Sequence, residues 1–432
     1  MKPLERNNTI KCTGAHVLFG VGGGLTSAFT VLPLMLKALG ASELVLGVAF
    51  SLATAGWLLL QPLAVFIFGR RTRTKRLLVP WSTAFSIPWV VAIGAVVFLL
   101  GRERATLCIA VVLILFAVRV IGEGMIFPFW DDWFAHLFSR GFRGRALGLV
   151  SGFMAVGISV GAVVAGRLQD RLAFPANYAV LFWGAAAVYA LAFAGIWWLR
   201  EPPSLTRAGK RHTVRELVNR FGLSLREANF RNYLIGRIIL TLGGGVVGFY
   251  AAHFGSPQGG DVAPATVITL GMLITLPQAI FAYLLGRLGD RAGHKSSVVV
   301  GACALAASIA VVWLGRGAVA CGLAFALLGL AASAGWGPHL NMLYETCPHD
   351  SRVAHITLSN LVLSPFLLAV PIATGWLREV AGVRTFGFAL IPVLIGVLWL
   401  AFRVKEPRTI EVVDLDGAPG ESSPEQRSAG RG

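Results

Sequence analysis

The sequence predicts an all-α membrane protein with twelve transmembrane helices, arranged as two parallel six-helix halves. Three observations support this fold class: the chain is poor in charge, its apolar runs are long, and its features recur at a fixed offset. Of its 432 residues, 14% are charged and 56% are hydrophobic, whereas a soluble domain carries about 25% charged residues. The composition therefore excludes an ordinary soluble domain.

Ten runs of the chain contain no Lys, Arg, Asp or Glu, and two more are interrupted only by Arg119 with Glu123 and by Arg237. A spanning helix needs about 20 apolar residues, and a backbone in hydrocarbon must satisfy its own hydrogen bonds, which favours helices. We therefore expect twelve spans, over residues 12–36, 44–69, 77–101, 105–130, 146–166, 172–199, 232–260, 262–286, 296–315, 317–344, 353–377 and 385–402.

Basic residues are concentrated in alternate loops. With a cytoplasmic N-terminus, the inner loops hold twenty Lys and Arg and the outer loops hold eight. This bias places both termini in the cytoplasm, in a bacterial-type inner membrane, with the first span as an uncleaved signal-anchor. The net charge of +17 thus reflects topology, and no basic stripe with interleaved aromatics indicates a nucleic-acid partner.

The spans divide the chain into two bundles joined by a polar connection. The connection opens with two prolines and contains an amphipathic stretch, and the polar tail is predicted to be disordered. The predicted organisation is a cytoplasmic N-terminus (1–11), a first bundle (12–200), a cytoplasmic connecting loop (201–231), a second bundle (232–404) and a cytoplasmic tail (405–432).

A triple glycine occurs in the first span and again in the seventh, 221 positions later. The same offset places His16 on Arg237 and Phe29 on Tyr250. Because each half contains an even number of spans, the halves are parallel, a plan that puts a substrate site between them. Small residues let membrane helices pack closely. Close packing and a hinge are therefore two alternative roles for the six glycines. They are Gly22, Gly23, Gly24, Gly243, Gly244 and Gly245.

The loop after the eighth span, GRLGDRAGHK (286–295), matches the pattern G-x-x-x-D-R-x-G-R/H-K. The matching residues are Gly286, Asp290, Arg291, Gly293, His294 and Lys295. On these residues the chain resembles the major facilitator superfamily, over about residues 10–404. The resemblance implies transport by alternating access without an ATPase. It also implies that the Asp and Arg of the motif latch the two halves on the cytoplasmic side in the outward-open state.

The equivalent loop of the first half, GRRTRTKR (69–76), departs from this pattern. Arg70 stands where the family has Asp, and Arg73 where it has Gly. A latch on this side would need an acid from elsewhere, and the alternative is that the loop only anchors the chain to anionic lipid. The candidates for the latch, around the cytoplasmic end of the fourth span, are Asp131, Asp132 and Arg143.

Arg119 and Glu123 lie inside the fourth span, four residues apart and so on one helix face. A charge at that depth is costly and faces a partner or a cavity. In the functional interpretation, Arg119 binds a substrate anion and Glu123 takes up a coupling proton when Arg119 turns to the substrate. The alternative is a static ion pair between packed helices.

Five further side chains are candidates for the substrate or proton pathway. Arg237 and His16 occupy matching places in the seventh and first spans; the alternatives are snorkelling for Arg237 and a structural hydrogen bond for His16. Tyr250 follows in the seventh span, and Trp336 with Asn341 lies in the tenth.

We therefore expect a secondary transporter of a small organic solute, with an anionic group favoured by the two arginines. The five scattered cysteines form no CxxC pair, so neither a metal nor a disulfide is expected. No catalytic or nucleotide-binding motif occurs, so we expect no enzyme activity and no cofactor. The expected partners are the substrate, protons and membrane lipids, for a monomer. The alternatives are a non-transporting membrane sensor or assembly protein, and a flippase for lipid or lysolipid.

Overall fold

The computed structural model describes residues 3–61, 63, 75–201, 222, 225–335, 337–346 and 352–406. Within these residues every regular element is a helix. Ten helical segments are long and apolar enough to cross a membrane, and the second predicted span is a shorter apolar helix in its described part. The predicted all-α membrane fold is confirmed, while the amphipathic stretch of the connection and the tail beyond residue 406 lie outside the described residues.

The first half packs as one bundle around α1. Helix α1 lies against α7 and α8, α5 lies against α6 and α8, and α3 lies against α6. The first predicted span is divided, since the chain leaves the helix after Leu25 and resumes it at Val31. The elements are α1 (Pro3–Leu25), α2 (Val31–Ala38), α3 (Glu43–Leu59), α5 (Lys75–Leu100), α6 (Ala105–Leu137), α7 (Arg140–Arg171) and α8 (Ala176–Trp197).

The second half repeats these pairings with its own helices. Helix α10 lies against α17 and α18, α14 against α15 and α18, and α13 against α15. The seventh, eighth and tenth spans, predicted as single helices, are each divided. The elements are α10 (Ala228–Gly244), the 3-10 helix η1 (Gly245–Phe249), α11 (Tyr250–Phe254), η2 (Pro257–Gly259), α12 (Pro264–Leu270), α13 (Met272–Ala292), α14 (His294–Leu314), α15 (Gly317–Ala334), α16 (Gly337–Thr346), α17 (Arg352–Ala381) and α18 (Arg384–Arg403).

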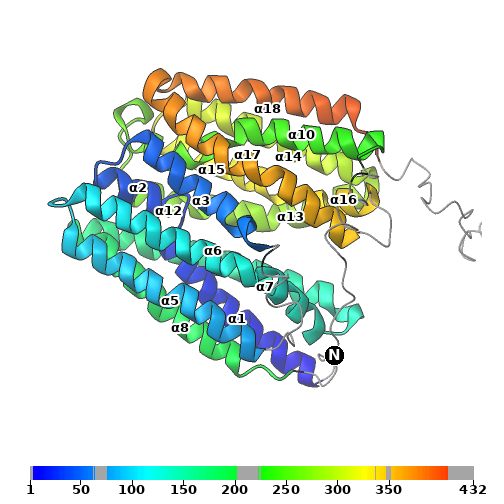
Figure 1. The fold of residues 1–432 in the computed structure, drawn as a ribbon, viewed down its shortest axis with the longest axis horizontal. Coiled ribbons are helices and arrows are strands. Elements are labelled where there is room, and N and C mark those ends of the chain that lie inside the picture. The colour runs from blue at the N-terminus through cyan, green and yellow to red at the C-terminus, as the bar shows by residue number, and fades with distance from the viewer. Residues whose placement is uncertain are drawn as a thin grey trace, which may run out of the picture.

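The two bundles lie side by side, and α3 of the first lies along α17 of the second (Figure 1). Helix α7 also packs on α12 and α13, and α2 touches α11. We call the end of the molecule where α1 begins and α18 ends the terminal end. The opposite end, which carries the α2–α3 and α17–α18 connections, is the far end (Figure 1).

Candidate functional site

A cavity of about 250 Å³ lies between the halves. Most of its wall comes from the second half, and the first half contributes only α3. The wall is largely apolar, with Thr54, Arg237, Thr241 and His339 as its polar side chains. The lining residues are Phe50, Thr54, Arg237, Leu240, Thr241, Gly244, Gly245, Val298, Gly301, Ala302, Leu305, Ala331, Ala334, His339, Leu367 and Pro371.

Arg237 is the one cation among the lining residues that the structure describes. Within the described part of the chain, no carboxylate forms an ion pair with it. Its neighbour in the wall, His339, is hydrogen-bonded through Nδ1 to the hydroxyl of Tyr233, one helical turn before Arg237. Among the described residues, the cavity wall therefore places a guanidinium without an ion-pair partner beside an imidazole whose Nδ1 is already hydrogen-bonded.

Arg119 and Glu123 form the predicted pair on α6, with Arg119 Nε 3.3 Å from Glu123 Oε1 and both side chains 13% exposed. Ser86 of α5 donates a hydrogen bond to the Glu123 carboxylate. On α8, the Tyr189 ring lies 5.6 Å from the Arg119 guanidinium carbon. Three helices of the first half thus hold the pair, and neither residue lines the cavity that contains Arg237.

His16, Tyr250 and Asn341 also lie outside the cavity wall. His16 Nδ1 is 2.8 Å from the carbonyl oxygen of Cys12, one turn back on α1. Tyr250 is 1% exposed and accepts a hydrogen bond from Ser308 Oγ at 3.3 Å, whereas Asn341 is half-buried on α16. Trp336 lies outside the described residues.

The signature loop ties α14 to the end of α18. Gly293, with a φ of +88° that favours glycine, makes the tight connection between α13 and α14. The Lys295 ammonium donates a hydrogen bond to the carbonyl oxygen of Ala401 at 2.7 Å. The backbone N–H of Lys295 donates one to the Glu406 carboxylate at 3.0 Å. These contacts stay within the second half.

The remaining residues of the predicted latch are placed only in part. Gly286 lies on α13 with open space beside it, Asp290 and Arg291 are exposed at the end of that helix, and His294 is buried. Residues 69–74 of the first-half loop and the side chains of Asp131, Asp132 and Arg143 lie outside the described residues. The latch therefore stays a prediction.

The two triple glycines occupy different structures. Gly22, Gly23 and Gly24 belong to α1, which continues to Leu25. Gly243 and Gly244 end α10, and Gly245 begins the 3-10 helix η1. Gly244 and Gly245 line the cavity, whereas none of the first three does.

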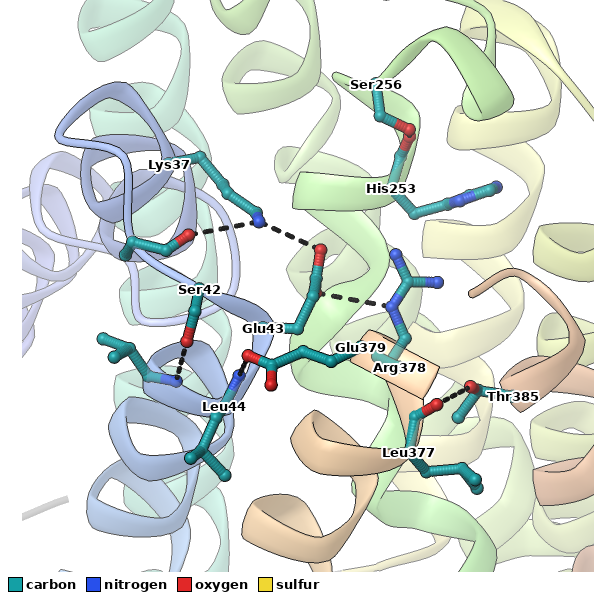
Figure 2. A network of polar contacts seen from close by, with 12 residues as sticks. Lys37, Ser42, Glu43, Leu44, His253, Ser256, Leu377, Arg378, Glu379 and Thr385 are labelled. Atoms are coloured by element: carbon teal, nitrogen blue, oxygen red, sulfur yellow. Dashed lines mark hydrogen bonds and ion pairs between the residues drawn. The ribbon is translucent and has the colours of Figure 1, made fainter. Parts of the chain in front are cut away.

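A polar network that the sequence analysis did not single out joins the halves at the far end (Figure 2). Glu43, the first residue of α3, forms ion pairs with Lys37 of α2 at 3.0 Å and with Arg378 of α17 at 3.4 Å. Next to it, the backbone N–H of Leu44 donates to Glu379 Oε1 at 3.0 Å. The one signal in the sequence is that Glu43 and Arg378 are charged residues at the ends of two predicted spans, a position that by itself indicates only where a span ends.

A family model described as Major Facilitator Superfamily matches residues 15–259, which is more than half of the chain. No curated protein sequence matches the chain. Solved structures that resemble it include transporters of low sequence identity.

A mutant of the nucleoside transporter NupG has a TM-score of 0.74 at 10% identity, with 93% of this chain and 100% of that one covered. A D-xylose-proton symporter has a TM-score of 0.70 at 16% identity, covering 94% and 99%. The xylose transporter XylE from E. coli, in a partially occluded inward-open conformation, has a TM-score of 0.65 at 15% identity, covering 97% and 100%. Identities this low support the fold alone.

Proposed function

The chain belongs to the major facilitator superfamily, and on that premise we propose that it is a secondary transporter of a small organic anion, working by alternating access. Its family and fold are those of membrane transporters rather than enzymes. The observation that carries the proposal is the cavity between the halves with Arg237 in its wall.

Arg237 supports an anionic substrate because a cation within a membrane span is costly unless a partner or water compensates it. Arg119, within a span of the first half, has its carboxylate 3.3 Å away. Arg237 has no such partner in the described part of the chain, and a carboxylate or phosphate of a substrate would supply one. The apolar remainder of the wall fits a substrate with an apolar body.

We propose that the terminal end faces the cytoplasm, as the charge bias of the loops favours, and that the far end faces outward. The described contacts between the halves lie toward that outer end. They include the Glu43–Arg378 pair and a hydrogen bond of 3.1 Å between Ser159 of α7 and Thr275 of α13. These contacts support an inward-open state, which we propose as one of the two states that alternating access requires.

Glu123 is the proposed site of the coupling proton. It accepts a hydrogen bond from Ser86 and is paired with Arg119, so its charge is compensated only while Arg119 stays in place. We expect Glu123→Gln to abolish uptake driven by a pH gradient and to leave substrate exchange intact. Unchanged gradient dependence in reconstituted Glu123→Gln would contradict this assignment.

The substrate class can be tested with purified protein in detergent, by thermal unfolding against a panel of carboxylates, phosphates, sugars, nucleosides, cationic drugs and lysolipids. A ligand at 100 times its dissociation constant stabilises the fold by about 2.7 kcal/mol. We expect organic anions to stabilise wild type and Arg231→Ala, an exposed control on the same helix, and to have no effect on Arg237→Ala.

Each other outcome favours a different function. Stabilisation by neutral sugars that survives in Arg237→Ala would contradict an anionic substrate. A response confined to lysolipids would favour a flippase, and silence across the panel would favour a membrane sensor or assembly protein.

A further inference from the structure

The contact between α3 and α17 at the outer end is reciprocal. The Glu43 carboxylate, on the first half, forms an ion pair with the Arg378 guanidinium of the second half at 3.4 Å. The Glu379 carboxylate, on the second half, accepts a hydrogen bond of 3.0 Å from the backbone N–H of Leu44 of the first half. We call these four residues, together with Lys37, the outer clasp (Figure 2).

Arg378 depends on Glu43 for its charge compensation. Its side chain is 5% exposed, and its guanidinium carbon lies 4.9 Å from the Phe386 ring centre and 5.9 Å from that of Phe249. Nη1 has no hydrogen-bond partner among the described residues. Its other polar neighbour, His253, is a buried imidazole rather than an anion (Figure 2), so Glu43 is the one anion paired with this guanidinium in the described chain.

Glu43 does not depend on Arg378 to the same degree. Its second partner, Lys37, lies 3.0 Å away on α2, within its own half, and is 33% exposed. If the halves separated at this end, Glu43 would keep Lys37, and Arg378 would gain water.

Below the clasp, the two helices touch through their backbones. A Cβ on Gly375 of α17 would lie 2.6 Å from the carbonyl oxygen of Glu43, and one on Gly47 of α3 would lie 3.1 Å from Ile372 Cα. Further along, Thr54 donates to the carbonyl oxygen of Leu367 at 3.3 Å, and both residues line the cavity. The seam between α3 and α17 therefore runs from the clasp to the cavity wall.

We propose that the outer clasp is the lock of the outer gate: it holds α3 against α17 while the cavity is open to the cytoplasm, and its Glu43–Arg378 pair must separate before the cavity opens outward. The direction named here rests on the proposed orientation and transport function. The lock itself is a contact between the halves, and its test uses no substrate.

We expect the removal of Glu43 and the removal of Arg378 to open the gate to different degrees. Removing Glu43 leaves a buried, unpaired guanidinium in the closed gate, and orphaned buried charges are strongly unfavourable. Removing Arg378 leaves Glu43 with Lys37. Glu43→Gln should therefore open the gate more than Arg378→Gln, and the double variant should be less open than Glu43→Gln alone, because pairs in contact are not additive.

Opening can be measured as the rate at which a maleimide labels Ser51→Cys in purified protein. Ser51 is 1% exposed, and its hydroxyl donates across the seam to the carbonyl oxygen of Leu368. The background carries serine in place of the five native cysteines, Cys12, Cys108, Cys303, Cys321 and Cys347. We expect slow labelling of the parent, at least a tenfold faster rate with Glu43→Gln, and an intermediate rate with Arg378→Gln.

Two matched variants separate the clasp from a general loosening. Glu103→Gln removes an exposed carboxylate from the α5–α6 loop, which lies at the same end of the molecule, and should leave the rate within twofold. Gly375→Ala forces the helices apart sterically without changing charge and should also raise the rate.

The proposal would be overturned if folded Glu43→Gln protein were labelled at a rate within twofold of the parent rate. Equal rates for Glu43→Gln and Arg378→Gln, or fast labelling of the parent, would also overturn it. Because no ligand is present, these outcomes are independent of whether the substrate screen succeeds.

Discussion

The two halves each carry a triple glycine and an arginine within a span, and these residues have different surroundings in the two halves. In the first half, Arg119 is paired with Glu123, and a Cβ on Gly24 would lie 2.7 Å from the backbone nitrogen of Ala162 on α7. In the second half, Arg237 and Gly244 both line the cavity, and a Cβ on Gly244 would meet nothing within 4 Å.

The backbone conformation around the two triple glycines also differs between the halves. Around Gly22–Gly24 it remains α-helical, and a side chain at Gly22 would meet the ring of Tyr189. At Gly245 the seventh span changes to a 3-10 helix, which packs on Val370 and Thr374 of α17. A repeat in sequence therefore marks corresponding positions without implying corresponding roles, because each helix meets different neighbours. In the first half the arginine is paired with a carboxylate away from the cavity, whereas in the second half the arginine lies in the cavity wall.

The largest expected difference between the halves is in the two arginines. Arg119→Ala should destabilise the fold by about 3–5 kcal/mol, because it leaves the Glu123 carboxylate buried without its cation. Arg237→Ala should change the unfolding free energy by less than about 1 kcal/mol, because no pair is broken. Thermal unfolding of both variants in detergent checks this contrast.

A matched double variant sharpens this test. Replacing both partners with Arg119→Leu and Glu123→Leu should recover most of the lost stability, since apolar residues of similar size often substitute well for a buried pair. Equal destabilisation by Arg237→Ala and Arg119→Ala would contradict the contrast between a paired Arg119 and an Arg237 that lines the cavity without an ion pair.

A smaller difference is expected between the glycines. Gly24→Ala should destabilise the fold by about 1–3 kcal/mol, the usual range for overpacking, because its methyl group meets the backbone of α7. Gly23→Ala is the control within the same helix, since its nearest neighbour would be 3.9 Å away. Equal unfolding temperatures for the two variants would show that α7 moves aside and that the contact is not tight.

The smallest effect on stability is expected at Gly244. Alanine there meets open space and has the better helix propensity, by up to about 1 kcal/mol, so Gly244→Ala should not lower the unfolding temperature. Gly244→Leu should also stay folded while filling the cavity, and should remove the stabilisation by any ligand found in the screen. Ligand binding that survives in folded Gly244→Leu would place the site elsewhere.

Much of the fold follows from local properties that the sequence displays directly. Apolar runs of spanning length predicted the membrane helices, and the spacing of Arg119 and Glu123 predicted that they meet on one helix face. The breaks were not predictable: the interruption after Leu25 and the 3-10 helix at Gly245 depend on which neighbours each helix packs against. The role of the first-half loop around Arg70 stays a prediction.

The candidate site followed from the sequence only in part. Arg237 was a candidate by its depth, but the rotation of α10 that brings it to the cavity, beside His339, depends on packing against α17 and α18. The clasp could not be predicted, because Glu43 and Arg378 are 335 positions apart and a single sequence contains no signal of such a pairing.

The most direct test of the central claim is uptake by reconstituted protein. An anion that stabilises wild type would be supplied in radiolabelled form to proteoliposomes containing wild type, Arg237→Ala or Arg231→Ala. We predict accumulation with wild type and Arg231→Ala, and only background counts with Arg237→Ala. Equal accumulation with Arg237→Ala, or none with wild type despite tight binding, would contradict a transporter whose substrate anion binds at Arg237.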